Sequence, residues 1–155
     1  MSRPERIVSK KEAMDILEKA EYGCLSMVTP DGHAYGVAVN HCYLREENII
    51  YFHCAVSGLK IDCLKANPNV SFFAVSQHKV VPERFITHYE SALAFGKARI
   101  IIDSKEIVKR LKGICDKFAP HVLERRGQVI AKHIDEVVIV EIGVESITGK
   151  RNSDN

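Results

Sequence analysis

Two histidine–cysteine pairs are the first residues in this sequence whose types and spacing suggest chemistry. His41-Cys42 and His53-Cys54 offer the nitrogen and sulfur ligands that bind zinc. Neighbouring residues of a strand point to opposite faces, so neither pair can direct both side chains to one ion. No Cys-x-x-Cys motif is present. We therefore expect no metal site, and we interpret the pairs as small buried thiols beside hydrogen-bonded histidines.

The segment over residues 51–60 predicts a strand that runs into the start of a helix. Ser57 is placed to cap that helix, Gly58 allows close approach to the backbone, and Lys60 adds a positive charge. The first amides of a helix are unpaired and carry the positive end of its dipole, so they attract anions. The pattern favours a phosphate site, although an ordinary capped helix with a solvated lysine has the same sequence.

A second polar group, Thr87-His88-Tyr89-Glu90-Ser91, opens a strand that continues into Ala92-Leu93-Ala94-Phe95. Polar side chains at alternate positions could line a cavity and hydrogen-bond a heteroaromatic ring. Alternation with one face in solvent is the competing interpretation. The sequence contains neither G-x-G-x-x-G nor G-x-S-x-G. Gly149-Lys150 is followed by arginine instead of serine or threonine, so it is not a nucleotide-binding loop.

Alternating strand and helix signals indicate how these groups are positioned. Capping residues and apolar periodicity predict helices over residues 10–20 and 58–66, and a third from Asp103 to Phe118. Short polar turns between strands favour antiparallel pairing, and hence a small β-barrel with helices outside it. We expect a loose stretch over 77–85, leave 121–134 unassigned, and expect a frayed tail over 151–155. The six predicted strands are residues 24–29, 34–44, 49–55, 70–76, 87–102 and 137–148.

Length and composition limit the possible classes of protein. A chain of 155 residues suggests a single domain over 1–155, and 27% charged residues with 46% hydrophobic ones indicate a globular fold. A net charge of +2 does not favour nucleic-acid binding. No window is apolar enough for a membrane helix, and no signal peptide is evident. Five cysteines in no paired pattern suggest reduced thiols and a cytoplasmic location.

Taken in their order and spacing, several stretches resemble the pyridoxamine-phosphate-oxidase-related flavoproteins, in particular the branch that includes nitroimidazole-resistance proteins. The matching stretches are LSMVTPDG (25–32), YGVAVN (35–40), IYFHCA (50–55), GLKID (58–62), NP (67–68), YES (89–91), FGKA (95–98) and ITGK (147–150). The resemblance implies a mainly β fold with peripheral helices, a six-stranded antiparallel split β-barrel. It also implies a homodimer that binds FMN in the cleft between its subunits.

The resemblance implies a place for each part of the cofactor. Ser57, Gly58 and Lys60 would hold the phosphate. The ring would lie against two strands, at Val39-Asn40-His41 and at His53-Cys54-Ala55. Polar contacts to the ring edge would come from Tyr89-Glu90-Ser91, and Lys150 would lie near the cofactor of its own or the other subunit.

The implied function is that of an FMN-dependent oxidoreductase that reduces a small electrophile such as a nitroaromatic or quinone-like compound. His53 is the candidate for contact with substrate or for proton transfer, since imidazole titrates near neutrality; a structural histidine is the alternative. The chain has no tryptophan and carries Leu59 where the oxidases have a second arginine, which argues against oxidation of pyridoxamine phosphate itself. Other functions remain open: flavin storage or sensing without turnover, haem binding through His41, His53 or His88, or an interaction module without cofactor.

Overall fold

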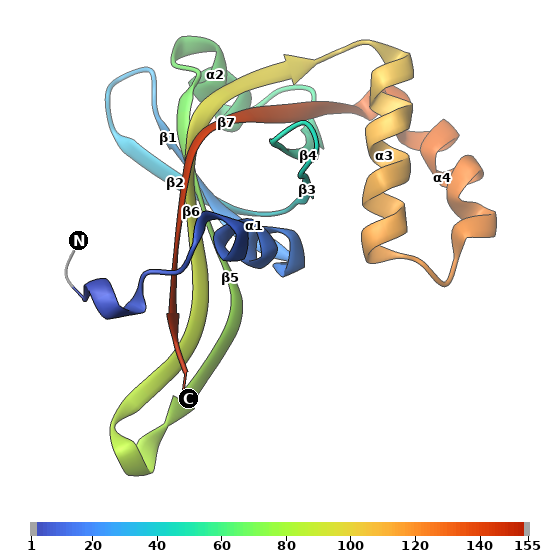
Figure 1. Ribbon diagram of the computed structural model, residues 1–155. Helices are drawn as coiled ribbons and strands as arrows, with labels where there is room; N and C mark the ends of the chain where they lie inside the picture. The colour runs from blue at the N-terminus through green and yellow to red at the C-terminus, as the bar shows by residue number, and fades with distance from the viewer. Residues whose placement is uncertain (1–2, 154–155) are drawn as a thin grey trace.

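A seven-stranded antiparallel sheet forms the body of the molecule in a computed structural model that describes residues 3–153. The sheet order is β2-β1-β5-β6-β7-β4-β3. Its two outermost strands are consecutive in the chain, so the sheet curls until its edges are joined through His41 (Figure 1). The strands are β1 Tyr22–Val28, β2 Ala34–Asn40, β3 Cys42–Leu44, β4 Ile49–Ala55, β5 Asn69–Val81, β6 Ile86–Ile101 and β7 Val137–Asn152. The α-helices are α1 Lys10–Lys19, α2 Leu59–Ala66, α3 Ser104–Phe118 and α4 Arg126–His133; short 3-10 turns are η1 Pro4–Arg6, η2 Pro82–Arg84, η3 Leu123–Arg125 and η4 Ile134–Glu136.

The expected split barrel is confirmed, but it has seven strands instead of six. The long strand expected over 34–44 is interrupted at His41, because β2 pairs with β1 whereas β3 pairs with β4. The His41 amide donates to the Glu21 carbonyl at 3.3 Å, and its carbonyl accepts from Lys117 Nζ at 2.8 Å. The main chain of His41 is thus held outside both ladders, and β2 and β3 are not paired with each other, which leaves the barrel open between them.

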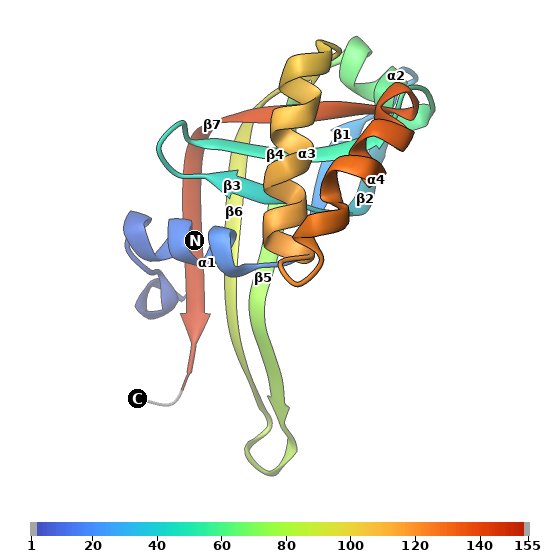
Figure 2. The ribbon, with the colours of Figure 1, turned by 90° about the vertical axis from the view of Figure 1, so that its right-hand side faces the viewer.

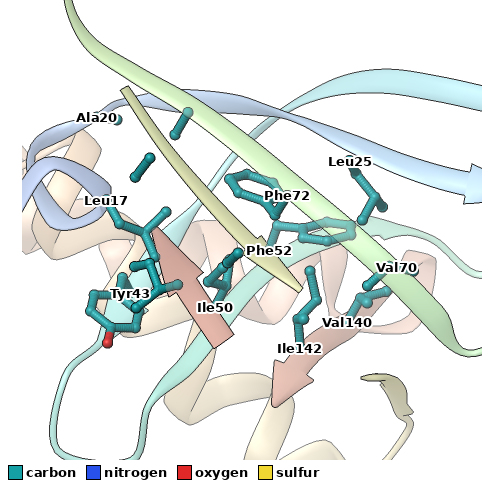
Figure 3. Close-up of a cluster of buried hydrophobic side chains, with 14 of the residues drawn as sticks. Leu17, Ala20, Leu25, Tyr43, Ile50, Phe52, Val70, Phe72, Val140 and Ile142 are labelled. Carbon is teal, nitrogen blue, oxygen red and sulfur yellow. The ribbon is translucent and has the colours of Figure 1, made fainter. Parts of the chain in front are cut away.

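Alternating side chains of the strands fill the barrel, and α1 packs across one end of it (Figure 3). The capping box predicted for α1 is confirmed: the Glu12 amide donates to Ser9 Oγ at 3.2 Å, and the Ser9 amide donates to the Glu12 carboxylate at 2.9 Å. The largest fully buried apolar side chains include Ile16, Leu17, Leu25, Ile50, Phe52, Phe72, Ile139, Val140 and Ile142. The core therefore fixes the curvature of the sheet on which the candidate residues lie.

A second layer is formed by α3 and α4, which lie outside the barrel against β4 and β7 (Figures 1 and 2). The amphipathic stripe predicted for α3 buries Ile107 and Leu111 against Tyr51 and Ile139. The segment that was left unassigned, 121–134, contains η3 and α4, and Ile130 of α4 joins the same cluster.

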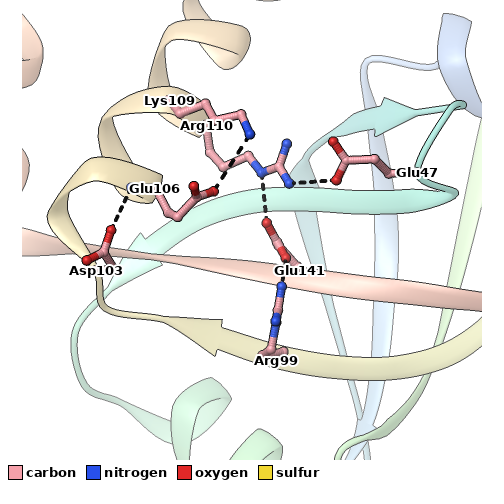
Figure 4. A network of polar contacts seen from close by, with 7 residues as sticks. All are labelled: Glu47, Arg99, Asp103, Glu106, Lys109, Arg110 and Glu141. Atoms are coloured by element: carbon pink, nitrogen blue, oxygen red, sulfur yellow. Dashed lines mark hydrogen bonds and ion pairs between the residues drawn. The ribbon is translucent and has the colours of Figure 1, made fainter.

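A buried ion pair fastens α3 to the sheet (Figure 4). Arg110 Nε donates to Glu141 Oε1 at 2.7 Å, and the two side chains are 6% and 3% exposed. Arg99 donates to the other carboxylate oxygen at 2.6 Å, and Arg110 also reaches Glu47 at 3.2 Å. Burial alone would raise the pKa of Glu141, but the hydrogen bonds from the two arginines lower it. The carboxylate therefore stays ionised inside the protein.

Two segments differ from expectation at the far end of the sheet. β5 continues to Val81 and β6 starts at Ile86, so the stretch expected to be loose is a long hairpin arm (Figure 1). The prediction of a frayed tail is wrong for its first two residues, because Arg151 and Asn152 belong to β7 and pair with Glu90 and Tyr89. Residues 154–155 of that tail lie outside the described residues.

Candidate functional site

The start of α2 has the geometry of an anion site. The helix begins at Leu59 and its cap is Gly58, which corrects the expectation that Ser57 caps a helix from Gly58. Gly58 has φ 127° and ψ 174°, a conformation that is almost confined to glycine. Nothing lies within 4 Å of the position a Cβ would take, and no side chain caps the first turn. The first amides of α2 therefore receive no hydrogen bond from a capping side chain.

Lys60 brings a positive charge to this junction and to the end of β4. Its Nζ lies 5.6 Å from the centre of the Phe52 ring. Burial lowers the pKa of His53, and the nearby Lys60 charge lowers it further. Burial raises the pKa of Cys54, and Lys60 partly opposes that rise. Ala55 ends β4, so the cation, the imidazole and the helix start lie within a few residues of one another.

The imidazole of His53 is the side chain of this group that is available to hydrogen-bond a ligand. Its imidazole makes no hydrogen bond to any residue from 3 to 153. It lies on the side of β4 that faces α3 and α4, whereas Phe52 and Cys54 point toward the barrel core. With its pKa lowered, the imidazole is neutral at neutral pH, so it can donate or accept one hydrogen bond.

The two predicted residues at the end of β2 have different environments. β3 and β4 pair only as far as Cys42↔Tyr51, whereas Asn40 pairs with Tyr22 of β1, so no strand pairing joins Asn40 to His53. Asn40 is exposed, while Val39 packs against the core. His41 is fully buried: its Nε2 lies 2.8 Å from the Leu17 carbonyl. The prediction that His41 contacts a cofactor or ligates haem is therefore wrong, because side chain and main chain are both engaged inside.

The second predicted group lies on β6 and β7, on two different faces. Ser91 and Lys150 line a hollow of about 230 Å³ together with Phe73 and Leu93. Tyr89 shares the strand face of Ser91 by alternation, and Glu90 lies on the other face. Glu90 accepts hydrogen bonds from Ser76 at 2.9 Å and from Arg151 at 2.8 Å. Its carboxylate is thus already used, and it does not face the hollow.

Within one chain the two groups lie at opposite ends of β7. Ala55 pairs with Val137 at its start, and Ser91 pairs with Lys150 near its end. Thirteen positions along β7 separate Val137 from Lys150, and the strand bends between them (Figure 1). No residue of β4 or α2 lines the hollow beside Ser91 and Lys150, so the two groups do not share this hollow in a single copy of the chain.

Several residues that could belong to the site were not predicted. Aliphatic side chains of α3 and α4, with Cys115, His133 and Glu136, surround a pocket of about 310 Å³ beside His53. The polar residues among them are scattered through an otherwise amphipathic pattern, so the sequence offers no signal for them. Arg151 was expected in a frayed tail, but it joins Glu90 and Glu12. Over residues 3–153, His, Cys, Asp and Glu nowhere gather in a group of three suited to a metal ion.

No helix of the described chain is long and apolar enough to cross a membrane. The model of the pyridoxamine 5'-phosphate oxidase family matches residues 9–151. No curated protein matches the chain in sequence.

Solved structures share this fold at low sequence identity. A candidate 5-nitroimidazole antibiotic resistance protein from Bacteroides thetaiotaomicron is 24% identical, with a TM-score of 0.76 over 93% of this chain and 85% of that one. A flavocytochrome from Azotobacter vinelandii is 16% identical, with a TM-score of 0.82 over 99% of this chain and 72% of that one. An FAD-binding protein from Mesorhizobium loti is 21% identical, with a TM-score of 0.66 over 96% and 98%.

Proposed function

The chain belongs to the pyridoxamine 5'-phosphate oxidase family, and from that premise we propose that it is an FMN-dependent oxidoreductase that reduces a small electrophilic compound. The observation that carries the proposal is the junction of β4 and α2. There an open glycine cap, a lysine and an imidazole without a hydrogen-bond partner among residues 3–153 lie within a few residues of one another, and burial together with the lysine charge lowers the pKa of the imidazole.

The residues at this junction fit a flavin mononucleotide. The amides after Gly58 and the Lys60 ammonium provide donors and positive charge for a terminal phosphate, and Ser57 can add a hydroxyl. The positive φ of Gly58 keeps a side chain out of the approach to these amides. Asn40 and His53 are both exposed and offer hydrogen bonds for the polar edge of a ring. When bound, the flavin would supply electron transfer, which no side chain here provides.

A second copy of the chain would complete the site. No residue of β4 or α2 lines the hollow beside Ser91 and Lys150, so Lys60 and this hollow do not share a pocket within one copy. The sheet face around that hollow is apolar and open, with Phe73 43% and Phe95 52% exposed. A homodimer in which this face covers the β4–α2 junction of its partner would bury these rings and bring both groups to one flavin.

His53 would orient the substrate at such a site. A neutral imidazole at an exposed position can hydrogen-bond a nitro or carbonyl oxygen without the desolvation cost of a charge when the substrate covers it. The neighbouring Lys60 charge favours this neutral state. His53 can thus hold the substrate oxygen and pass a proton to it from solvent.

The test is an FMN titration of the purified protein, followed by addition of a nicotinamide donor. We expect one FMN per chain, a dimer in solution, and bleaching of the flavin bands by the donor. Lys60→Met should weaken FMN binding by ~10- to 100-fold, the loss of one charge-assisted hydrogen bond. The matched control is Lys65→Met, on the last turn of the same helix, which should bind FMN like the wild type.

Each other result has a definite meaning for the proposal. Equal FMN affinity in both lysine variants would overturn the phosphate assignment. Bound FMN that no nicotinamide donor bleaches would replace the oxidoreductase by a storage or sensing protein. Uptake of haem or FAD in preference to FMN would overturn the choice of cofactor.

A further inference from the structure

A pocket between the helical layer and the sheet shares only His53 with the flavin site proposed above. It lies among α3, α4, β4 and the start of β7, and its volume is about 310 Å³. Its walls are mainly aliphatic. Ile114 comes from α3 and Val129 from α4, and the pocket also reaches the His53 imidazole.

The size of the pocket limits its occupant. An apolar protein cavity of about 150 Å³ binds benzene, so twice that volume accepts one or two fused rings. The lower end of the usual range for ligand pockets is about 300 Å³. A nucleotide or a haem would not fit within it.

The charges around the pocket limit the occupant further. No lysine or arginine lines it. The His133 Nδ1 atom lies 2.8 Å from a carboxylate oxygen of Glu136, so this ring nitrogen is already engaged. A bound anion would meet the Glu136 carboxylate with no lysine or arginine in the pocket lining to balance its charge. The pocket therefore favours a neutral molecule.

One polar contact remains available to such a molecule. The His53 imidazole lines the pocket and makes no hydrogen bond to any residue over 3–153. We propose that this pocket binds a neutral aromatic molecule of one or two rings, whose hydroxyl, carbonyl or nitro group hydrogen-bonds His53. The statement that this molecule is the substrate rests on the proposed function, because His53 also borders the Lys60 junction. The statement that the pocket binds such a molecule does not require a flavin.

The probe is 2-naphthol, which is neutral at neutral pH, has two rings and fluoresces. The chain has no tryptophan, so the fluorescence of the probe is well separated from that of the protein. We expect saturable binding of one molecule per chain to flavin-free protein. The anion 2-naphthoate has the same rings and should bind at least ~10-fold more weakly, because Glu136 repels it.

Two matched variants locate the site. Val129→Phe fills the pocket from a side chain that is 47% exposed, so it leaves the core intact, and it should weaken 2-naphthol binding at least ~10-fold. Val122→Phe makes the same change at a 48% exposed residue outside this pocket and should bind like the wild type. Equal binding in both variants, or equal affinity for 2-naphthol and 2-naphthoate, would overturn the inference.

A second measurement reports on the pocket directly. Cys115 lines it, whereas Cys24 is a partly exposed thiol on β1. 2-Naphthol should slow alkylation of Cys115, followed by peptide mass spectrometry, and leave Cys24 unchanged; equal rates at Cys115 with and without probe would contradict occupancy. Probe binding without FMN uptake would support the pocket as a binding site and refute the proposed function. FMN uptake without probe binding would refute only the inference that the pocket binds an aromatic molecule.

Discussion

His41 should make the protein acid-labile. The imidazole is fully buried, packs edge-on against Phe72 with 4.7 Å between ring centres, and uses Nε2 on the Leu17 carbonyl. Its Nδ1 atom has no partner over residues 3–153. Burial lowers the pKa of His41 to about 4; the hydrogen bond to Leu17 opposes that change, and the Lys117 charge adds to it.

The loss of folding stability in acid follows from the pKa of His41 in the folded chain, about 4, and its ordinary value of 6.5 in the unfolded chain. Above pH 6.5 the imidazole is neutral in the folded and the unfolded chain, and it contributes no pH dependence. As the pH falls from 6.5 toward 4, the unfolded chain binds a proton that the folded chain refuses, so stability is lost. Below about pH 4 both states are protonated and the loss is complete, at about 3 kcal/mol for a pKa difference of that size.

The perturbation is His41→Gln, which keeps a nitrogen donor toward the Leu17 carbonyl and does not titrate. Urea unfolding followed by circular dichroism at fixed protein concentration gives the free energy of unfolding at pH 7 and at pH 4. The wild type should lose about 3 kcal/mol more than the variant between the two. The ring proton signals of His41 should also stay at their neutral positions until about pH 4. Parallel pH profiles of the two proteins would refute the reasoning.

Three other substitutions test the ion pair, the glycine cap and the imidazole. Glu141→Gln should lower the free energy of unfolding by about 3 kcal/mol in urea titrations, because it leaves the buried Arg110 with only the half-exposed Glu47 as a charged partner. Arg99→Gln on the 71% exposed partner should cost under about 1 kcal/mol, and similar losses in the two variants would contradict the difference in burial. Gly58→Ala and Gly32→Ala each introduce a side chain at positive φ, so each should cost about 1–3 kcal/mol, but only Gly58→Ala should weaken FMN binding in a fluorescence titration. His53→Ala should lower turnover of a nitroaromatic by ~10²-fold or more at normal FMN occupancy, and unchanged turnover would end its catalytic role.

Local sequence signals predicted most of the fold. The capping box at Ser9 and Glu12 and the apolar stripe of α3 appear in the structure as expected, because both depend on residues a few positions apart. The break at His41 was not predictable, since it is imposed by Glu21 and Lys117 from distant segments. The arm of β5 and β6 was missed because much of it is exposed, so it has no regular apolar alternation.

The candidate site also contains residues that the sequence could predict and residues that it could not. The junction at Gly58 and Lys60 could be found because a strand, a glycine and a lysine follow one another in the chain. Which of Tyr89 and Glu90 faces the hollow was not predictable, because one residue of register exchanges the two faces. His41 was misplaced for a related reason: whether a strand histidine points to a core or a cleft depends on partners such as Leu17.

The position of β7 in the sheet also affects how the chain folds. The β3–β4 hairpin joins the rest of the sheet only through β7, which follows every other strand in the chain. During synthesis, Ile50 and Phe52 of β4 therefore have no neighbouring strand beyond β3 until residues 137–143 have emerged. Contacts of such long sequence separation make folding slow and leave apolar strands exposed meanwhile. We expect ribosome-bound chains stopped before β7 to need chaperone protection, and full-length chains to acquire protease resistance in one late step.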